Sequence, residues 1–466
     1  MDPLKHELLA LLAPHGQEQL LRFWDSLDAS QRESLAGDIR SVDFRLVAEL
    51  YRQEDSKAAM RVLAARGTSP PAFALGDPRN RISPETARQQ GEEALRAGSV
   101  GAMLVAGGQG TRLGFKHPKG MFPIGPVSGK SLFQIHFEKV GATARRYGVR
   151  IPLYLMTSPE THEETMAYLR GHEYFGFPAD DLCVFCQGTM PAVDAPTAKV
   201  LLADRHHVAL SPDGHGGMLA AFARSGAMAD ARRRAIRHLF YFQVDNPLVS
   251  VCDPEFLGYH LLSASEFTSQ VVRKHQPLEK VGNVVEVDGR LYVIEYSDLP
   301  DDVAARRTAD GSLEIWAGSI AVHAMELSFL ERMVETAGGL PFHRASKKVA
   351  HLDEQGNRVQ PAEPNAVKFE RFIFDLMPSA ERAIVVEVDP ARHFAPLKNA
   401  SGQPRDTPEG VKAQMAALHR EWLRRAGFEV GDDVPVEIGP LFALDADELA
   451  ARMLSKKPIT QPTYFG

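Results

Sequence analysis

A glycine-rich segment near residue 110 has the composition of an anion-binding loop. It reads Ala106-Gly107-Gly108-Gln109-Gly110-Thr111-Arg112-Leu113-Gly114 and is followed by Pro118-Lys119-Gly120. Four glycines in nine residues let the backbone pass close to a ligand with its N–H groups turned inward. The spacing fits neither the P-loop nor the dinucleotide-binding fingerprint. A glycine-rich turn with a surface arginine is the alternative, but the Thr-Arg and Pro-Lys pairs at this spacing favour a phosphate loop.

Two cations of this segment could take part in phosphoryl chemistry. Arg112 and Lys119 carry positive charge that can stabilise the extra negative charge of a phosphoryl transition state. Asp245 directly follows the apolar run Leu239 to Val244, and a carboxylate there is a candidate Mg²⁺ ligand. Asn246-Pro247 come next, so a helix N-cap or a turn residue is the alternative for Asp245.

The elements that must position these residues alternate between strands and helices. Short apolar runs at 100–105, 152–156 and 239–244 are typical of strands that are covered on both faces. An amphipathic helix is expected from Leu132 to Arg146, and two apolar runs flanking Asp288-Gly289 predict a β-hairpin. This alternation predicts an α/β domain with a doubly wound, mostly parallel sheet, whose ligands bind at the carboxyl ends of the strands.

The remaining sequence suggests three regions. Residues 1–95 have apolar residues at helical spacing and are expected to form a helical N-terminal region, with a helix starting at Ser83-Pro84. Residues 96–400 are expected to form the catalytic domain. Residues 401–466, which include a helix over 411–426, are expected to form a small C-terminal domain.

Composition and cysteine use exclude several classes of protein. A net charge of -7 argues against a nucleic-acid surface, and no apolar run is long enough to span a membrane. Cys183, Cys186 and Cys252 are too few for a disulfide framework, which indicates a reducing compartment. Cys183 and Cys186 lie in an expected strand with no second metal-binding pair at zinc spacing. No signal peptide is recognisable, and a cytoplasmic protein is expected.

The glycine loop and its downstream motifs resemble one enzyme family. The loop sequence is similar to the signature of the sugar-nucleotide pyrophosphorylases, and its longer form resembles the eukaryotic-type UDP-sugar branch, closest to the UDP-N-acetylhexosamine pyrophosphorylases. The resemblance covers about residues 100 to 402 in order. It continues through Met156-Thr157-Ser158, Gln187-Gly188-Thr189-Met190-Pro191-Ala192, Ser211-Pro212-Asp213-Gly214-His215-Gly216-Gly217, Val244-Asp245-Asn246, Val293-Ile294-Glu295-Tyr296-Ser297 and Pro396-Leu397-Lys398-Asn399-Ala400.

This resemblance implies a Rossmann-like mixed sheet of the nucleotide-diphospho-sugar transferase type and a set of site residues. It implies catalytic roles for Arg112, Lys119 and Lys398, and a magnesium ligand in Asp245. The implied substrate-binding residues are Leu104, Ala106, Gly107, Gly108, Gly110, Thr111, Gln187, Met190, Pro191, Gly214, His215, Gly217, Asn246, Glu295, Tyr296 and Ser319. Gln187, Met190 and Pro191 would line the uracil pocket, because a glutamine amide can both donate to and accept from uracil. Gly214 and Gly217 would let the nucleotide approach, and Glu295 and Tyr296 would face the sugar.

Two departures from the family pattern fall on the sugar and ribose side. The family's N-A-G-N segment is here Trp316-Ala317-Gly318-Ser319, and its S-P-D-G-N-G-G segment has His215 in place of the asparagine. UTP is therefore the firmer of the two expected substrates. N-acetylglucosamine-1-phosphate is the expected sugar, and glucose, galactose and N-acetylgalactosamine phosphates remain alternatives.

The expected reaction joins a sugar-1-phosphate to UTP. A phosphate oxygen attacks the α-phosphorus of UTP in line and pyrophosphate leaves, so no general base is needed and positioning and charge supply the catalysis. The alternatives are a glucose-1-phosphate or relaxed UDP-sugar pyrophosphorylase, a nucleotide-sugar-binding regulatory protein, and a glycosyltransferase, which would carry an Asp-x-Asp motif. The expected partners are the two substrates and Mg²⁺ in a monomer or homodimer, without nucleic acid or membrane.

Overall fold

The computed structural model describes residues 2–53, 56–336, 339–453 and 457–466. Contacts divide the chain into two units. Unit 1 comprises Met1–Met60, Gln187–Met218 and Leu340–Asp375, and unit 2 comprises Arg61–Cys186, Leu219–Gly339 and Leu376–Gly466. The units do not follow the boundaries expected at residues 95 and 400, because unit 1 is assembled from three separate segments.

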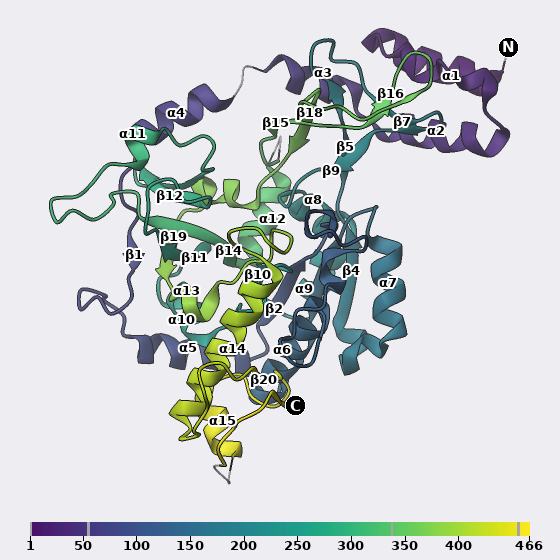
Figure 1. The fold of residues 1–466 in the computed structure, drawn as a ribbon. Coiled ribbons are helices and arrows are strands. Elements are labelled where there is room, and N and C mark those ends of the chain that lie inside the picture. Colours follow the sequence, from purple (N-terminus) through teal and green to yellow (C-terminus); the bar gives the residue numbers. More distant parts are fainter. Residues whose placement is uncertain (1, 54–55, 337–338, 454–456) are drawn as a thin grey trace. The chain divides into compact units, whose positions relative to one another are not determined.

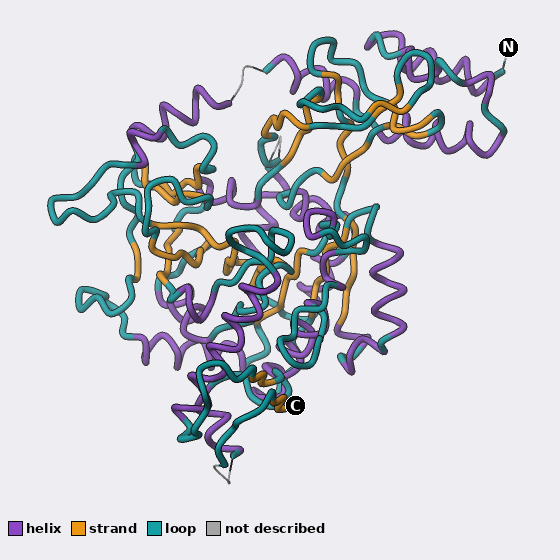
Figure 2. Tube along the Cα trace, in the orientation of Figure 1, coloured by secondary structure: helices purple, strands orange, loops and turns teal. Residues whose placement is uncertain are grey.

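Unit 2 is built on a mixed sheet of ten strands (Figures 1 and 2). Eight of them follow the order β1-β19-β11-β14-β10-β2-β3-β4, and β12 joins the sheet through β14. The pairs from β10 to β4 are parallel, while β14 is antiparallel to both of its neighbours, β10 and β11. The sheet is therefore mixed, with a parallel half that begins at the strand before Asp245. The strands are β1 (Ala72–Phe73), β2 (Val100–Val105), β3 (Leu153–Thr157), β4 (Leu182–Cys186), β10 (His238–Gln243), β11 (Phe267–Arg273), β12 (Gly282–Val287), β13 (Arg290–Ile294), β14 (Ala317–Glu326) and β19 (Ala383–Glu387).

The central strands are buried on both faces, as their continuous apolar runs predicted. Every residue of β2 and of β3 is buried. Alternate side chains of these strands, such as Leu104 and Leu155, join a core with residues of α5, α6 and α10. On the other face, Tyr154 packs against Phe222 of α8. The strand assignments at 100–105, 152–156 and 239–244 are confirmed to within one or two residues.

Two predicted local structures are confirmed in unit 2. Strands β12 and β13 pair as an antiparallel hairpin, with Asp288 and Gly289 both at positive φ in the turn. Helix α5 begins at Pro84, and the hydroxyl of Ser83 accepts a hydrogen bond from the backbone N–H of Thr86 at 3.1 Å. The helices of unit 2 include α4 (Ser56–Arg66), α5 (Pro84–Arg96), α6 (Leu132–Tyr147), α7 (His162–Gly171), α9 (Ala227–Arg233), α10 (Pro254–Leu262), α11 (Asp301–Ala304), α12 (Leu327–Glu335), α13 (Pro390–His393), α14 (Pro408–Arg425) and α15 (Ala446–Arg452), while β20 (Val436–Ile438) pairs with β21 (Thr463–Phe465).

Unit 1 combines the first three helices with short strands from two later segments. Its core joins leucines of the helices to Val193, Val200 and Phe369 of the later segments. The helices at 3–52 therefore bury their apolar faces against strands from residues 187–218 and 340–375. The elements are α1 (Pro3–Leu12), α2 (Ala29–Ser41), α3 (Phe44–Arg52), β5 (Thr189–Pro191), β6 (Val193–Asp194), β7 (Leu202–Asp204), β8 (His207–Val208), β9 (Leu210–Pro212), β15 (His343–Lys347), β16 (His351–Leu352), β17 (Arg358–Val359) and β18 (Ala366–Glu370), and α8 (Gly217–Arg224) begins in this unit.

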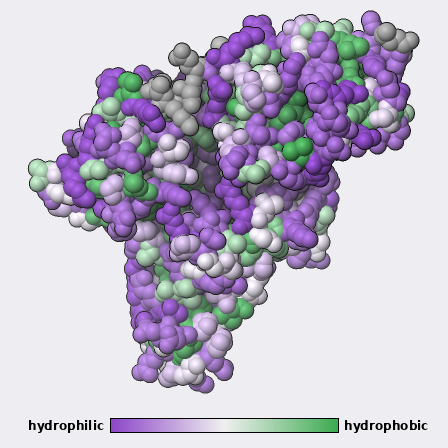
Figure 3. Space-filling model, turned by 45° about the horizontal axis from the view of Figure 1, so that its top comes forward, coloured by the Kyte–Doolittle hydropathy of each residue, from purple (hydrophilic) through white to green (hydrophobic). Residues whose placement is uncertain are grey.

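The face of the molecule drawn in Figure 3 is mainly hydrophilic, with hydrophobic residues scattered over it. Among the described residues, no helix combines the length and the apolar character that crossing a membrane requires.

Helices α5 and α10 pack backbone to backbone through two glycines, and this contact generates a stability prediction. A Cβ on Gly258 would lie 1.6 Å from the carbonyl oxygen of Ala87, and a Cβ on Gly91 would lie 1.8 Å from that of Pro254. We expect Gly258→Ala to lower the free energy of unfolding by about 1–3 kcal/mol, because the helices must separate. Urea denaturation measures this change. Gly141→Ala in α6 is the control, since its Cβ would meet only Phe177 at 3.8 Å; equal stability of the two variants would contradict the prediction.

A candidate nucleotide-phosphate site in unit 2

The glycine loop leaves the carboxyl end of β2 and folds back on itself. The backbone N–H of Gly110 donates to the carbonyl of His117 at 2.9 Å, and that of Lys119 donates to the carbonyl of Gly108 at 3.0 Å. Thr111 to Leu113 form a single 3₁₀ turn between these two bonds. These two hydrogen bonds hold together the two ends of the loop that carries Arg112 and Lys119.

Glycine is required at one position of this loop for close packing, while another glycine faces open space. A Cβ on Gly110 would lie 2.7 Å from the ring of Phe115, so close packing within the loop requires glycine there. A Cβ on Gly108 would meet nothing within 4 Å, so this position faces open space. Gly108 is exposed, and it is therefore the part of the loop where a ligand can approach the backbone.

Four of the predicted residues meet around the ammonium group of Lys119. Its Nζ lies 4.0 Å from Oδ2 of Asp245, and the two side chains are only 18% and 14% exposed. Burial lowers the pKa of Lys119, the carboxylate of Asp245 opposes this, and the charges of Lys398 and Arg112 lower the pKa further. Lys119 therefore interacts electrostatically with one carboxylate and two further cations. The side chains of these two cations, Arg112 and Lys398, are exposed.

The segment before Lys398 closes this cluster. The carbonyl of Leu397 accepts a hydrogen bond from Nζ of Lys119 at 3.3 Å, and its N–H donates to the carbonyl of Asp245 at 2.8 Å. The N–H of Lys398 itself donates to the carbonyl of Asp406 at 2.9 Å. One residue, Leu397, therefore connects the glycine loop to the strand end that carries Asp245.

Two side chains of helix α6 donate hydrogen bonds to the backbone on both sides of Asp245. Nε2 of His136 donates to the carbonyl of Val244 at 3.0 Å, and burial lowers the pKa of this histidine to about 3, so the ring is neutral. Lys139, one turn later, donates to the carbonyls of Pro247 and Val249 at 2.5 and 2.8 Å. Burial lowers the pKa of Lys139 to about 7. The residues on both sides of Asp245 are thus held by one face of α6.

Both the nitrogen and the oxygen of the Asn246 side-chain amide bond to the backbone. Its Nδ2 donates to the carbonyl of His393 at 2.8 Å, and its Oδ1 accepts from the N–H groups of Leu248 and Ala395 at 3.2 and 3.0 Å. The residue was predicted to bind substrate. The observed bonds join the strand end to the segment that leads to Leu397, and a contact with substrate stays a prediction.

A second group of predicted residues lies around Gly282 in β12. A Cβ there would lie 3.6 Å from Oε1 of Glu295 and 3.9 Å from Cβ of Ser319, so these two side chains face the same point. Tyr296, which was predicted to face the sugar with them, has an exposed side chain. The pairing of β12 with β14 brings the two predicted sugar-side segments together.

Lys274 belongs to this neighbourhood and was missed in the sequence. Its Nζ donates to Oδ1 of Asn283 at 2.5 Å and to the carbonyl of Pro277 at 3.3 Å, and burial lowers its pKa to about 8. Its local sequence signal is weak, because the strand β11 that directly precedes it is buried but mixed in sequence, with Thr268, Ser269 and Gln270 among its residues. Trp316 is one of the residues that depart from the family pattern. The guanidinium carbon of Arg273 lies 4.2 Å from the centroid of its ring.

Six predicted residues belong to unit 1, where two motifs pair with each other: Gln187, Met190, Pro191, Gly214, His215 and Gly217. Strand β5 carries Met190 and Pro191 and is antiparallel to β9, and the N–H of Asp213 donates to the carbonyl of Gly188 at 3.1 Å. The segment from Gln187 and the segment from Gly214 to Gly217 therefore lie side by side.

The glycines of the second motif pack against the chain itself. A Cβ on Gly214, which has φ of +83°, would lie 2.4 Å from the carbonyl oxygen of Arg371. A Cβ on Gly217 would lie 2.0 Å from the carboxylate of Asp213. Folding of this turn alone is thus enough to require glycine at both positions, whatever ligand they approach.

His215 sits in an aromatic cluster that the sequence did not reveal. Its ring centroid lies 5.3 Å from that of Phe372 and 5.5 Å from that of Phe374. Its Nδ1 accepts a hydrogen bond from the N–H of Ile373 at 3.2 Å, and burial and the neighbouring His343 lower its pKa to about 4. The ring is therefore neutral and keeps its Nε2–H as a donor.

A cavity of about 580 Å³ in unit 2 does not coincide with the predicted site. It lies among α5, α6, α14 and the segment from Pro247 to Glu255, and none of the predicted site residues is among the described residues that line it. Its charged walls are paired, for example Arg146 with Asp445 at 2.7 Å and Arg425 with Asp447 at 3.4 Å. We assign it to the packing of the C-terminal helices.

Comparison with known proteins places the chain in one family. The model of the UTP–glucose-1-phosphate uridylyltransferase family matches residues 46–405. A UDP-N-acetylhexosamine pyrophosphorylase-like protein 1 of Xenopus tropicalis is 33% identical over 97% of this chain and 90% of its own length. The UDP-N-acetylglucosamine pyrophosphorylase of Saccharomyces cerevisiae is 34% identical over 93% of this chain and 94% of its own. The fold is that of the solved UDP-N-acetylglucosamine pyrophosphorylase of Trypanosoma brucei, with a TM-score of 0.80 at 24% identity, covering 97% of this chain and 95% of that one.

The charge cluster around Lys119 predicts how its pKa responds to neighbouring substitutions. Asp245→Asn removes the negative charge that favours the ammonium form, so we expect the pKa of Lys119 to fall further. Lys398→Met removes a positive charge and should raise it. The pH dependence of acylation at Lys119, followed by mass spectrometry of the peptide, measures both shifts. Lys116→Met, a change at an exposed lysine of the same loop, serves as the control. A pKa that rises in Asp245→Asn would show that the cluster is not assembled as described.

Proposed function

The chain belongs to the UTP–glucose-1-phosphate uridylyltransferase family, and from this we propose that it joins UTP to N-acetylglucosamine-1-phosphate and releases pyrophosphate. The observation that carries the proposal is the convergence of Arg112, Lys119 and Lys398 with one carboxylate at the end of a buried parallel strand. Anionic ligands of mixed sheets of this kind bind at the carboxyl ends of strands. The exposed Gly108 backbone lies in the same loop.

The reaction needs charge and position more than proton transfer. The attacking phosphate oxygen of the sugar-1-phosphate is already ionised at neutral pH, and in-line attack at the α-phosphorus breaks its bond to the pyrophosphate. Lys119 would hold the α-phosphate region, where its ammonium is poorly solvated and therefore interacts strongly with developing charge. Arg112 and Lys398, both exposed at the edge, would close on the triphosphate when it binds.

Asp245 has the chemistry of a magnesium ligand. Magnesium is usually held by one or two carboxylates together with substrate phosphate oxygens. The carboxylate of Asp245 is little exposed and lies 4.0 Å from the ammonium of Lys119, the outer limit of an ion pair, so it is not locked to that group. When bound, Mg²⁺ would neutralise charge on the leaving pyrophosphate. Leu397 and α6 would keep the carboxylate in place through the backbone of residues 244–249.

The sugar is proposed from the relatives and from the group around Gly282. The relatives cited above are named for N-acetylhexosamine or N-acetylglucosamine, and Glu295 and Ser319 would contact the sugar hydroxyls. Glucose-1-phosphate is the second candidate, because Trp316 and Ser319 stand where the family has asparagines and the family description itself names that substrate. The uracil roles of Gln187, Met190 and Pro191 stay predictions from the resemblance.

Removing either loop cation tests the proposed reaction. We expect Arg112→Ala and Lys119→Ala each to lower kcat for pyrophosphate release by about 10²–10³-fold, because a preorganised charge at the phosphates is lost. Lys116→Ala, at an exposed lysine between them in sequence, should keep wild-type activity. A coupled pyrophosphate assay with UTP and the preferred sugar phosphate gives the rates. Near wild-type activity of both cation variants would refute the proposal.

Restoring one family asparagine tests the sugar assignment. In Ser319→Asn, the longer amide supplies a donor and an acceptor beside Glu295, so the ratio of kcat/KM for N-acetylglucosamine-1-phosphate over glucose-1-phosphate should rise up to about tenfold, the worth of one hydrogen bond. Ser328→Asn, an exposed position just beyond the opposite end of β14, should leave the ratio unchanged. A ratio that stays unchanged in Ser319→Asn, as in the control, would show that Ser319 does not face the sugar.

A further inference from the structure

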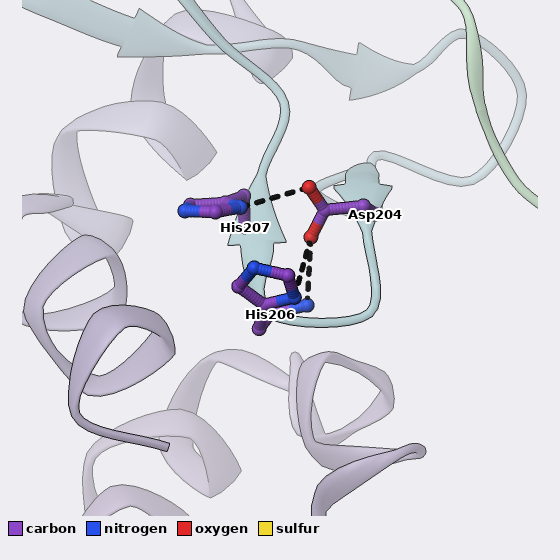
Figure 4. Close-up of side chains that lie close together, drawn as sticks. All are labelled: Asp204, His206 and His207. Atoms are coloured by element: carbon purple, nitrogen blue, oxygen red, sulfur yellow. Dashed lines mark hydrogen bonds and ion pairs between the residues drawn. The ribbon is translucent and has the colours of Figure 1, made fainter. Parts of the chain in front are cut away.

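The turn between β7 and β8 in unit 1 gathers two imidazoles and a carboxylate (Figure 4). Asp204 ends β7 and His207 begins β8, and the two residues are direct partners across the antiparallel pair. His206 lies in the turn between them. One ligand atom from each of the three side chains lies within 4.8 Å of the others. Nothing in the proposed uridylyltransferase reaction uses these residues.

Both imidazoles turn the same ring nitrogen toward the one carboxylate. Nδ1 of His207 lies 2.8 Å from Oδ2 of Asp204, and Nδ1 of His206 lies 3.2 Å from Oδ1. The three side chains are 29–49% exposed, so an ion from solvent can reach them. Ligands of a tetrahedral zinc ion stand ~3.4 Å apart, given bonds of ~2.1 Å. Small rotations of half-exposed rings therefore bring all three donors to bonding distance.

Helix α2 supplies the partner that a metal-bound histidine needs. The other ring nitrogen of His207, Nε2, lies 3.1 Å from Oγ of Ser34. A histidine that binds a metal through one nitrogen almost always donates its other N–H to such a group. Asp38 lies one turn after Ser34 on the same helix and accepts a hydrogen bond from the N–H of Val208 at 2.9 Å. Its carboxylate interacts electrostatically with Asp204, His206 and His207 and adds negative charge beside the site.

We propose that Asp204, His206 and His207 bind one divalent transition-metal ion, Zn²⁺ by the chemistry of the donors, with Ser34 orienting His207. Two imidazole nitrogens and one carboxylate suit zinc and its neighbours and not Mg²⁺, which requires oxygen ligands. The bound ion ties the β7–β8 turn together and, through Ser34, ties it to α2. Its role is to stabilise unit 1, separately from the Asp245 site in unit 2.

The test is calorimetric titration of the full-length, chelator-treated protein with ZnCl₂ in the absence of nucleotide. The expected result is one saturable Zn²⁺ site that Mg²⁺ does not compete for, together with a zinc-dependent rise in the unfolding temperature. Co²⁺ should give visible d–d bands from nitrogen and oxygen ligands. This site and its thermal shift should be lost in His206→Ala/His207→Ala and kept in His6→Ala, which removes an exposed histidine of α1 in the same unit. Asp245→Asn should also keep them.

Two further variants keep the test decisive. Ser34→Ala removes no ligand, and we expect it to weaken Zn²⁺ binding by about 10–100-fold, as loss of an orienting partner does. If the double variant does not fold, His206→Ala alone replaces it, because this turn residue makes the longer contact to Asp204. Absence of saturable binding, or Zn²⁺ binding that is unchanged in these histidine variants, would overturn the proposal.

Discussion

The candidate phosphate site depends on the largely buried ammonium group of one lysine. A buried ammonium group needs a negative charge and a hydrogen-bond acceptor close to it. Asp245 supplies the charge to Lys119, and the carbonyl of Leu397 supplies the acceptor. Leu397 also donates its N–H to the carbonyl of Asp245, so the glycine loop, the strand β10 and the segment before Lys398 are fixed by one residue. The cations converge because these three backbone segments cannot separate without leaving a buried charge unpaired.

A set of supporting contacts holds the backbone on both sides of Asp245. The side-chain amide of Asn246 bonds to the backbone of residues 248, 393 and 395, and His136 and Lys139 in α6 bond to the backbone carbonyls of residues 244, 247 and 249. They determine the position of Asp245, and a geometry set this rigidly costs little reorganisation when a phosphate binds.

Features that depend on neighbouring residues in the sequence could be predicted, and features that depend on tertiary contacts could not. The apolar runs of β2, β3 and β10, the Asp288-Gly289 hairpin and the Ser83 cap depend on neighbours in sequence, so each was predictable. The glycine loop, Lys119, Lys398 and Asp245 were found by motif, and the structure places them together. Unit 1 was not predictable, because its helices bury their faces against strands more than 100 residues away. Lys274, the aromatic cluster around His215 and the structural use of Asn246 arise only from tertiary contacts, which no local spacing encodes.

The residues proposed for nucleotide chemistry and those that depart from the family pattern are different residues of the chain. The phosphate cluster retains the family residues. One departure lies at β14, where Trp316 is held under Arg273, which is itself paired with Glu387, and the other is His215 in unit 1. The most direct measurement is pyrophosphate release from UTP by the unaltered chain with N-acetylglucosamine-1-phosphate and glucose-1-phosphate side by side, with Mg²⁺ present. The account predicts turnover with a higher kcat/KM for N-acetylglucosamine-1-phosphate. A chain that binds UTP but releases no pyrophosphate with either sugar phosphate would contradict it.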